Sequence, residues 1–399
     1  MKATGLIVEY NPFHNGHLFH LKESKAQSNA DIIIVVMSGH FTQRGEPTVI
    51  SKWDRTKMAL LNGADLVIEL PYLYSCQSAD LFATGSVSIL THLKVKELIF
   101  GSESGNIVEL QKLEALTSTQ DFQNKLKTFL NLGYSLPNAT KKALDTSGIP
   151  TDLATLPNNT LGLYYMRAIK SLNSEIIPNT ITRIHSGYHD ALPSHQSIAS
   201  ATSVRHLRES AQLYTDYVPE TVAELLEQHV KTTNTYHNWE SYFPILKQKI
   251  LTLTPTYLVQ IHDVEEGIEH RLFTGMLQAS SYAQFMDYVK TKRYTTTRIQ
   301  RICANILTHT TKQFITDSNL HQGAPYIRIL GATPNGRAYL KSIKKDITVP
   351  IYSKFDQQAH PLLKHEQSVT AAYSSILPEP HCTTLNKKEY TQFPIMIDV

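Results

Sequence analysis

Four runs of consecutive apolar residues in the first hundred positions set the strongest limit on how this chain can fold. They are TGLIVEY over 4–10, DIIIVVM over 31–37, ADLVIEL over 64–70 and KELIF over 96–100. The segments between them show helical periodicity, over 16–27, 51–62 and 75–90. Strands that are apolar throughout are buried on both faces, as in parallel sheets covered by helices. The alternation of strands and helices predicts a doubly wound α/β domain with a parallel sheet.

A fifth strand is expected over 177–184, after a mostly helical stretch over 106–175, and a helix is expected over 202–213. Beyond about residue 212 the strand pattern fades. Amphipathic helices are predicted over 222–230, 242–252, 266–279, 282–292 and 297–308. Strand-like pieces at 326–330 and 348–351 then flank a helix near 337–343. We therefore predict a domain over 1–212 and a mostly helical region over 213–399, which includes either a small α+β unit from about 324 or the closing part of the helical region.

The composition excludes several classes of protein. A net charge of +3 gives no strong global field, so a surface that binds nucleic acid must be a local cluster of basic residues. The three cysteines, Cys76, Cys303 and Cys382, lie far apart without a CxxC pair, which excludes a disulfide framework or a zinc knuckle. The N-terminal segment lacks a signal-peptide pattern, and no apolar run approaches the about 20 residues that span a bilayer. We expect a soluble, cytoplasmic protein that does not act at a membrane and has no protein metal site.

The segment EYNPFHNGH over 9–17 carries the clearest chemical signal. A buried strand ends there, a turn with proline follows, and a helix begins near Gly16. Ligands of open α/β sheets bind at the carboxyl ends of the strands, and the N–H groups of a helix N-terminus suit a phosphate. His14 and His17 are three residues apart, so both can face one side of the first turn and stabilise charge as pyrophosphate leaves. The alternatives are two surface histidines or a metal site, for which the ligand set is incomplete.

A second segment with suitable chemistry is Ile198–Arg205, IASATSVR. Ser200 or Thr202 can cap a helix and contact a phosphate, and Arg205 supplies a cation; an ordinary capped helix is the alternative. The two segments together resemble the HxGH and I-S-S-T-x-x-R signatures of the nucleotidyltransferase superfamily, with Ala201 in place of the second serine. This resemblance implies a Rossmann-like nucleotidyltransferase domain that binds ATP.

Further blocks make the resemblance closer. They are MSGHFTQRGEP over 37–47, GADLVIELP over 63–71, FGSESG over 100–105, LPNNTLGLYY over 156–165 and RIHSGYHD over 183–190. With EYNPFHNGH they resemble the bacterial tRNA(Met) cytidine acetate ligase family, over most of the first 210 residues and more loosely beyond. The resemblance implies that ATP and acetate form acetyl-adenylate, with Mg²⁺ bridging phosphate oxygens. The acetyl group then passes to N4 of the wobble cytidine of elongator tRNA(Met).

On this resemblance the catalytic candidates are His14, His17 and Arg205. The ATP-binding candidates are Gly5, Leu6, Ile7, Val8, Glu9, Tyr10, Asn11, Pro12, Phe13, Asn15, Gly16, Leu18, Gly101, Asn159, Arg183, Ser200 and Thr202. Three of these have structural alternatives: Asn159 as a helix N-cap, Arg183 as a structural cation and Gly101 as an ordinary glycine between strand and loop.

Other polar residues near the expected site either contact a ligand or have an ordinary structural role. They are Gln43 and Arg44 after the second strand, Ser102 and Glu103 after the fourth, Lys52 and Arg55 at the start of a helix, and Lys22 in the first helix. Gln43 and Arg44 are candidates to touch the triphosphate or the acetate. For Lys52 and Arg55 the charged surface of a helix is favoured over substrate contact, and for Lys22 a solvated face is favoured.

A run of basic residues without an acid, over 290–301, is the candidate tRNA-binding segment. Its members are Lys290, Lys292, Arg293, Tyr294, Arg298 and Arg301. Arg298 and Arg301 share a helix face, and Tyr294 can stack on an unpaired base. A second basic stretch comprises Arg328, Arg337, Lys341, Lys344 and Lys345. The alternative is an ordinary solvated helix face; the bunching of basic residues and the family resemblance favour RNA.

Two other functions remain open at this point. A small-molecule adenylyltransferase uses the same HxGH chemistry but needs no long helical, basic C-terminal region. An RNA-binding protein with a non-catalytic nucleotide fold would not need intact His14, Gly16, His17 and Arg205.

Overall fold

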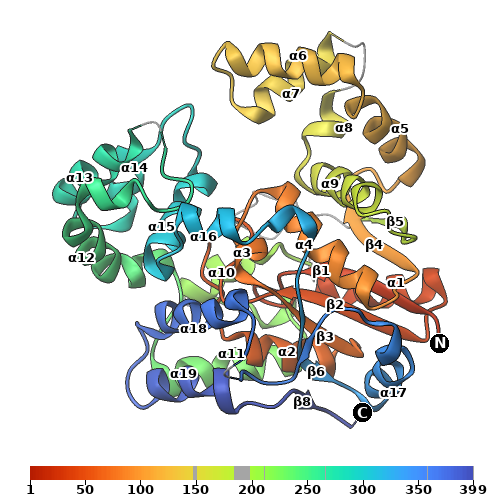
Figure 1. Cartoon of the computed structure of the whole chain (residues 1–399). Helices are drawn as coiled ribbons and strands as arrows, with labels where there is room; N and C mark the ends of the chain where they lie inside the picture. Colours follow the sequence, from red (N-terminus) through yellow and green to blue (C-terminus); the bar gives the residue numbers. More distant parts are fainter. Residues whose placement is uncertain (147–150, 184–197, 211, 266, 357, 399) are drawn as a thin grey trace.

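The parallel sheet predicted by the apolar runs is present in the computed structural model, which describes residues 1–146, 151–183, 198–210, 212–265, 267–356 and 358–398. The strands are β1 Ala3–Val8, β2 Ile32–Ser38, β3 Leu66–Leu70, β4 Glu97–Ser102, β5 Ile177–Thr182, β6 Ile327–Ala332, β7 Ile351–Tyr352 and β8 Ile395–Met396. Their order is β5-β4-β1-β2-β3-β6-β7, with β8 beside β6 (Figure 1). β1 to β5 begin and end within two residues of the predicted bounds.

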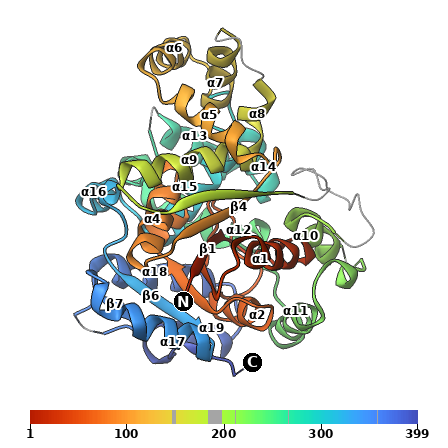
Figure 2. The ribbon, with the colours of Figure 1, turned by 90° about the vertical axis from the view of Figure 1, so that its right-hand side faces the viewer.

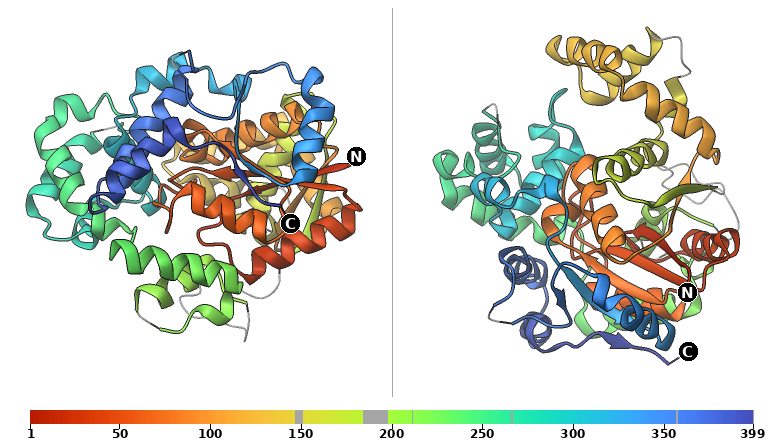
Figure 3. Two further views of the ribbon diagram at one scale, coloured as in Figure 1. Left: turned by 90° about the horizontal axis from the view of Figure 1, so that it is seen from below. Right: turned by 45° about the vertical axis from the view of Figure 1, so that its right-hand side comes forward.

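Helices cover both faces of this sheet, so the prediction of a doubly wound α/β fold is confirmed. α1 Asn15–Ser28 and α2 Lys52–Leu61 pack on one face, and α4 Ala79–His92 packs on the other (Figure 3). Every residue of β2 and β3 is buried, because both faces of these strands meet a helix layer. The strand order reverses between β1 and β4, so the carboxyl ends of the strands flank a topological switch point.

A helical insertion separates β4 from β5, as the stretch 106–175 predicted. It contains α5 Ile107–Thr117, α6 Gln120–Asn131, α7 Leu136–Asp145, α8 Thr151–Thr155 and α9 Pro157–Ser171. α9 packs against α4, while α6 and α7 stand at the top of the molecule (Figure 2). The short α3 Tyr72–Ser75 precedes α4, where the sequence predicted one helix from residue 75.

The region after β5 is mostly helical, as expected. Its helices are α10 Ala201–Glu209, α11 Glu220–Thr233, α12 Trp239–Leu258, α13 Ile268–Gln278, α14 Tyr282–Val289, α15 Thr296–Thr308 and α16 Lys312–Asp317, with short 3₁₀ turns at Thr215–Tyr217 and Leu320–Gln322. Residues 184, 211 and 266, which fall within predicted elements, lie outside the described residues.

The chain then returns to the sheet. β6 pairs antiparallel with β3, and β7 and β8 pair parallel with β6. α17 Pro334–Ile343, the 3₁₀ turn Lys344–Asp346, α18 Pro361–Ser374 and α19 His381–Thr391 complete this part. β6 therefore extends the sheet of the first domain. The boundary near residue 212 and the small α+β unit from about residue 324 stay predictions.

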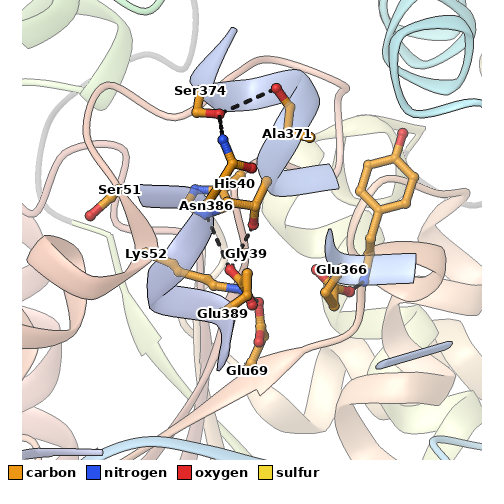
Figure 4. Close-up of polar contacts among 12 residues, drawn as sticks. Gly39, His40, Ser51, Lys52, Glu69, Glu366, Ala371, Ser374, Asn386 and Glu389 are labelled. Carbon is orange, nitrogen blue, oxygen red and sulfur yellow. Dashed lines mark hydrogen bonds and ion pairs between the residues drawn. The ribbon is translucent and has the colours of Figure 1, made fainter. Parts of the chain in front are cut away.

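A buried cluster of charges joins α19 and β6 to the first domain, and Figure 4 shows three of its members, Lys52, Glu69 and Glu389. Lys52 Nζ lies 2.6 Å from Glu69 Oε1 and 2.9 Å from Glu389 Oε1. Arg328 Nη1 lies 3.0 Å from Glu69 Oε2 and 2.7 Å from Glu389 Oε2. These four side chains are at most 1% exposed. The interpretation of Lys52 as a charge on a helix surface is therefore wrong, because its ammonium group lies in this buried cluster.

Arg55 is likewise fully buried, so the interpretation as a surface charge is wrong. Its guanidinium donates to the carbonyl oxygens of Glu9 (2.7 Å) and Ser38 (3.0 Å), and to that of Gly39. These carbonyls lie just beyond β1 and at the end of β2. Arg55 therefore ties together the backbone that leads into the site.

Candidate active site

A cavity of about 410 Å³ lies at the carboxyl ends of β1, β4 and β5. Its walls come from α1, the loop 42–46, α4, α9 and α10. The predicted residues that line it are Ile7, Val8, Glu9, Tyr10, Asn11, His14, Gly16, His17, Gln43, Arg44, Gly101, Arg183, Ser200, Thr202 and Arg205. The structure thus brings both sequence segments to one cavity.

His14 and His17 form the N-terminus of α1 by capping each other's backbone. His14 Nδ1 accepts a hydrogen bond from the N–H of Gly16 at 3.0 Å, and His17 Nδ1 accepts one from the N–H of His14 at 3.3 Å. The two rings stack with their centroids 3.7 Å apart. A Cβ atom at Gly16 would lie 2.9 Å from the His14 ring, so this position needs glycine. The local sequence HNGH therefore fixes the orientation of both imidazoles.

Both histidines are neutral. Burial, with the charges of Arg183 and Arg205, lowers the pKa of His14 to about 3. Burial and the neighbouring His14 hold the pKa of His17 well below 6.5. Since each Nδ1 accepts a backbone hydrogen bond, the neutral ring carries its proton on Nε2. Each ring can therefore donate a hydrogen bond to a phosphate oxygen without being charged.

Two arginines supply positive charge at the same cavity. Arg205 of α10 pairs with Glu46 Oε2 at 2.8 Å and is 18% exposed. Arg183, just after β5, donates to the side chain of Asn158 at 3.4 Å. Both lie close enough to His14 to lower its pKa. Guanidinium groups bind phosphate oxygens strongly, so the cavity combines a helix N-terminus with two cations.

Seven of the ATP-binding candidates lie outside the cavity lining: Gly5, Leu6, Pro12, Phe13, Asn15, Leu18 and Asn159. Leu6 and Phe13 are fully buried in the core. A Cβ atom at Gly5 would lie 2.7 Å from Leu90, so this glycine allows α4 to pack on β1. Asn15 donates to the carbonyl oxygen of Asp216 at 2.9 Å. These contacts position the strand and helix that carry the site.

Asn159 connects the loop after β4 to the first turn of α9. Its Oδ1 accepts hydrogen bonds from the N–H groups of Glu103 (3.0 Å) and Ser104 (3.2 Å). The Glu103 carboxylate accepts from the N–H groups of Asn158 (3.1 Å) and Asn159 (2.8 Å). Asn159 is not the N-cap of α9. Glu103 and Ser102 do not line the cavity; their contact with ligand hydroxyls stays a prediction.

Ser200 is the N-cap of α10, where its hydroxyl accepts from the N–H of Ser203 at 3.0 Å. The capping role is therefore confirmed, at the edge of the same cavity. Lys22 is exposed on α1, as favoured from the sequence. Arg205 also donates to the backbone oxygen of Asn11 at 2.9 Å, which joins the two sequence segments directly.

Sequence reasoning missed about half of the lining. The missed residues are Phe19, His20, Thr42, Glu46, Ala79, Phe82, Phe100, Pro157, Asn158, Thr160, Leu161, Tyr165, Ile181, Thr182, Ile198 and Ala201. One signal was available: His20 continues the three-residue spacing of His14 and His17 along α1. Among the described residues the buried His20 Nε2 and the hydroxyl of Tyr10 have no hydrogen-bond partner, so both are available to a ligand.

The basic segment 290–301 contains three exposed basic residues and two arginines that form ion pairs with acids. Lys290, Lys292 and Arg293 are exposed. Arg298 pairs with Glu265 at 3.0 Å and Arg301 with Asp263 at 3.3 Å. These two acids, distant in the sequence, neutralise part of the expected basic patch.

Tyr294 and Arg328 differ from expectation because both are buried. Tyr294 is 4% exposed and its hydroxyl donates to the backbone oxygen of Glu265, so its ring is not open for stacking on a base. Arg328 belongs to the buried charge cluster and cannot contribute to a basic surface. Arg337 is exposed and pairs with Asp398 at 3.2 Å.

Three further points concern a metal site, a membrane span and the block RIHSGYHD. Within those ranges no group of three or more His, Cys, Asp or Glu side chains could hold a metal ion. In the same ranges no helix has the length and apolar character needed to cross a membrane. In the block RIHSGYHD, only Arg183 falls within the described residues.

Comparison with known proteins agrees with this geometry. The family model described as HIGH Nucleotidyl Transferase matches residues 1–389. The tRNA(Met) cytidine acetate ligase of Geobacillus sp. (strain WCH70) is 46% identical over 99% of this chain and 100% of its own length. The enzyme of the same name from Bacillus subtilis (strain 168) is 44% identical over 100% of this chain and 98% of its own.

Solved structures give the same result. The crystal structure of Thermotoga maritima TmcAL (apo, form I) is 31% identical and superposes with a TM-score of 0.91 over 100% of both chains. The structure of that protein bound with alpha-thio ATP has a TM-score of 0.89 at the same identity and coverage. Similarity over the whole length and the assembled HxGH cavity lead to one conclusion: this chain belongs to the tRNA(Met) cytidine acetate ligase family of HIGH nucleotidyltransferases.

Proposed function

We propose that this chain activates acetate with ATP as acetyl-adenylate and transfers the acetyl group to N4 of the wobble cytidine of elongator tRNA(Met). The observation that carries the proposal is the pair of neutral histidines at the N-terminus of α1, in one cavity with Arg183 and Arg205. Such a site suits attack on an α-phosphate, and membership of this ligase family supports acetate and tRNA as the substrates.

The geometry of the cavity supports the following first half-reaction. The α-phosphate binds at the N-terminus of α1, where Nε2–H groups of His14 and His17 donate to its oxygens. An acetate oxygen attacks the α-phosphorus, and the bond to the bridging oxygen of pyrophosphate breaks. Arg183 and Arg205 stabilise the charge that moves onto pyrophosphate. Mg²⁺ supplies further charge neutralisation when bound, and it would be held by phosphate oxygens and water, which requires no dedicated cluster of protein ligands.

The second half-reaction needs an unstacked anticodon base at the same cavity. We infer that the exposed Lys290, Lys292 and Arg293 contact tRNA phosphates, because they lie on the segment that leads into α15. Arg298 and Arg301, already paired with acids, would join only if those pairs open. Since the substrates are ATP and tRNA, we place the reaction in the cytoplasm.

The test is exchange of labelled pyrophosphate into ATP, with and without acetate. The wild-type protein should show exchange that depends on acetate, and His17→Ala should lose at least about 100-fold of it, because a donor to the transition state is removed. His321→Ala, an exposed histidine outside the cavity lining, is the matched control and should retain wild-type exchange.

Transfer of labelled acetate to elongator tRNA(Met), compared with a tRNA that lacks a wobble cytidine, then tests the acceptor. Exchange without acetate, or no exchange and no transfer under any condition, would refute the proposal. Label transfer to tRNA without prior exchange would mean that tRNA completes the site.

A further inference from the structure

The adenylation machinery leaves part of the cavity lining without a role. His14, Arg183 and Arg205 gather around the N-termini of α1 and α10 and the end of β5. The lining also includes a wall formed by Phe82 of α4, Tyr165 of α9 and the loop 42–46, whose Glu46 contacts Arg205. This wall combines aromatic rings with polar loop residues, which suits a base that has left its stack.

Glu9 lies at this wall, directly after β1. Its Oε1 accepts a hydrogen bond from the N–H of Gln43 at 2.6 Å, and its charge raises the pKa of the buried Tyr165, whose main perturbation is burial itself. Gln43 is held in turn, since its Nε2 donates to the carbonyl oxygen of Gln77 at 2.7 Å. The Glu9 carboxylate is therefore fixed in place, and it lines the cavity.

Glu9 differs from every other base in the described cavity lining. Burial lowers the pKa of His14 to about 3 and that of His20 to about 4, and it holds the pKa of His17 well below its ordinary value. The carboxylate of Glu46 is committed to Arg205. Within the described residues no ion pair within 4 Å involves Glu9. Burial raises the pKa of Glu9 and the charge of Glu46 adds to this, while the N–H of Gln43 and the charges of Arg44 and Arg205 oppose it. The net rise makes its carboxylate a stronger base than an ordinary glutamate.

We propose that Glu9 binds the exocyclic amine of the cytidine and accepts its proton during acetyl transfer, an inference that rests on the proposed function. The amine nitrogen forms a bond to the carbonyl carbon of acetyl-adenylate, and the bond from that carbon to the phosphate oxygen of AMP breaks. AMP leaves with the electron pair, the amine proton passes to Glu9, and water later removes it. A carboxylate also accepts from the amine of cytosine and repels the O4 oxygen of uracil, so Glu9 distinguishes the two bases.

The test compares Glu9→Gln with Glu46→Gln, the same change at the other carboxylate of the lining. Enzyme loaded with ATP and labelled acetate is mixed with elongator tRNA(Met), and the rates of acetyl transfer and of pyrophosphate exchange are measured separately. A general base contributes about 10²–10⁴-fold. In Glu9→Gln transfer should therefore fall at least about 100-fold more than exchange, whereas Glu46→Gln should change both rates by a similar factor.

The pH dependence separates proton transfer from a merely structural role. In the wild type the transfer rate should rise with pH until Glu9 ionises, at a pH above the ordinary range of a glutamate. Glu9→Asp keeps a carboxylate and should keep this rise at a lower rate, while Glu9→Gln should lose the rise. Glu9→Gln should also narrow the preference for a wobble cytidine over a wobble uridine, because an amide can donate to O4.

Equal losses of exchange and transfer in Glu9→Gln, or an unchanged pH profile of transfer, would overturn the assignment. Thermal unfolding of Glu9→Gln near the wild-type midpoint would show that the variant folds, since glutamine keeps an acceptor for the N–H of Gln43. If the wild type itself shows neither acetate-dependent exchange nor transfer, the proposed function fails, and the role of Glu9 fails with it.

Discussion

Replacing Glu389 by glutamine should cost more stability than any single change on the surface. The carboxylate lies within 3 Å of both Lys52 Nζ and Arg328 Nη1, and all three side chains are at most 1% exposed. The change keeps the shape of the side chain but leaves two buried cations with one anion, Glu69. Breaking a buried ion pair in this way costs about 3–5 kcal/mol. An unfolding entropy of roughly 2.1 cal/mol/K per residue converts this cost into a fall of about 4–6 °C in Tm.

The assay is thermal unfolding followed by circular dichroism, with Glu227→Gln as the control. Glu227 pairs with Lys231 four residues on along the exposed face of α11, at 3.4 Å. Exposed pairs of this kind contribute less than about 1 kcal/mol, so the control should shift Tm by no more than about 1 °C. A Glu389→Gln protein that melts within 1 °C of the wild type would refute the reasoning.

A double variant and a pH series test the cause of this loss. Adding Lys52→Met to Glu389→Gln removes one cation with one anion, so the double variant should be more stable than the sum of the single losses by at least about 1 kcal/mol. Burial opposes ionisation of Glu389, but Arg328 and Lys52 outweigh it and lower its pKa to about 2. This carboxylate therefore stabilises the fold above its unfolded pKa of about 4.3, and the contribution is lost as the pH falls towards 2. Additive losses, or the same acid sensitivity in Glu389→Gln, would contradict the ion-pair account.

Three further predictions concern the cavity. Acetate-dependent exchange should not decline near pH 6.5, because the pKa of His17 lies well below that value; a decline centred there in the pH profile would contradict neutral histidines. Gly45→Ala should raise the KM for ATP several-fold, since its Cβ atom would lie 2.5 Å from the backbone of α15, whereas Gly133→Ala, at a similar positive φ with nothing within 4 Å, should leave KM unchanged. Glu46→Gln should lower the Kd for ATP several-fold in calorimetry by freeing Arg205, and weaker binding would contradict competition between Glu46 and the phosphates.

The local sequence pattern was sufficient to predict the strands and the part of the site that follows β1. The apolar runs around Ile33 and Val67 predict buried parallel strands because burial on both faces leaves no polar alternation. The position of His14 after β1 predicts the cavity because the carboxyl ends of parallel strands carry the ligand sites of such folds. Both signals arise from neighbours in the sequence.

Contacts between distant residues could not be read in the same way. The charge of Lys52 predicts a position on a helix surface. The residue is buried because Glu389, which no spacing rule connects to it, neutralises that charge. Tyr294 is predicted to face a base, yet it is buried with its hydroxyl on the backbone of Glu265. The antiparallel β6 joins a parallel sheet through pairing with β3, and that choice depends on the shape of the exposed sheet edge. Whether a polar group is buried depends on partners that are distant in the sequence, so the segment that carries the group does not reveal its burial.

The pairing of β6 with β3 has a consequence for the order of events during translation. A ribosome delivers residues 1–212 long before it delivers β6 and α19. Until then the nascent chain exposes the edge of β3 and leaves Lys52 without the carboxylate of Glu389. The helix α2, which carries both Lys52 and Arg55, therefore cannot reach its final stability early. Vectorial synthesis should delay the formation of acetyl-adenylate until the later residues have folded onto the sheet, so unfinished chains would not consume ATP.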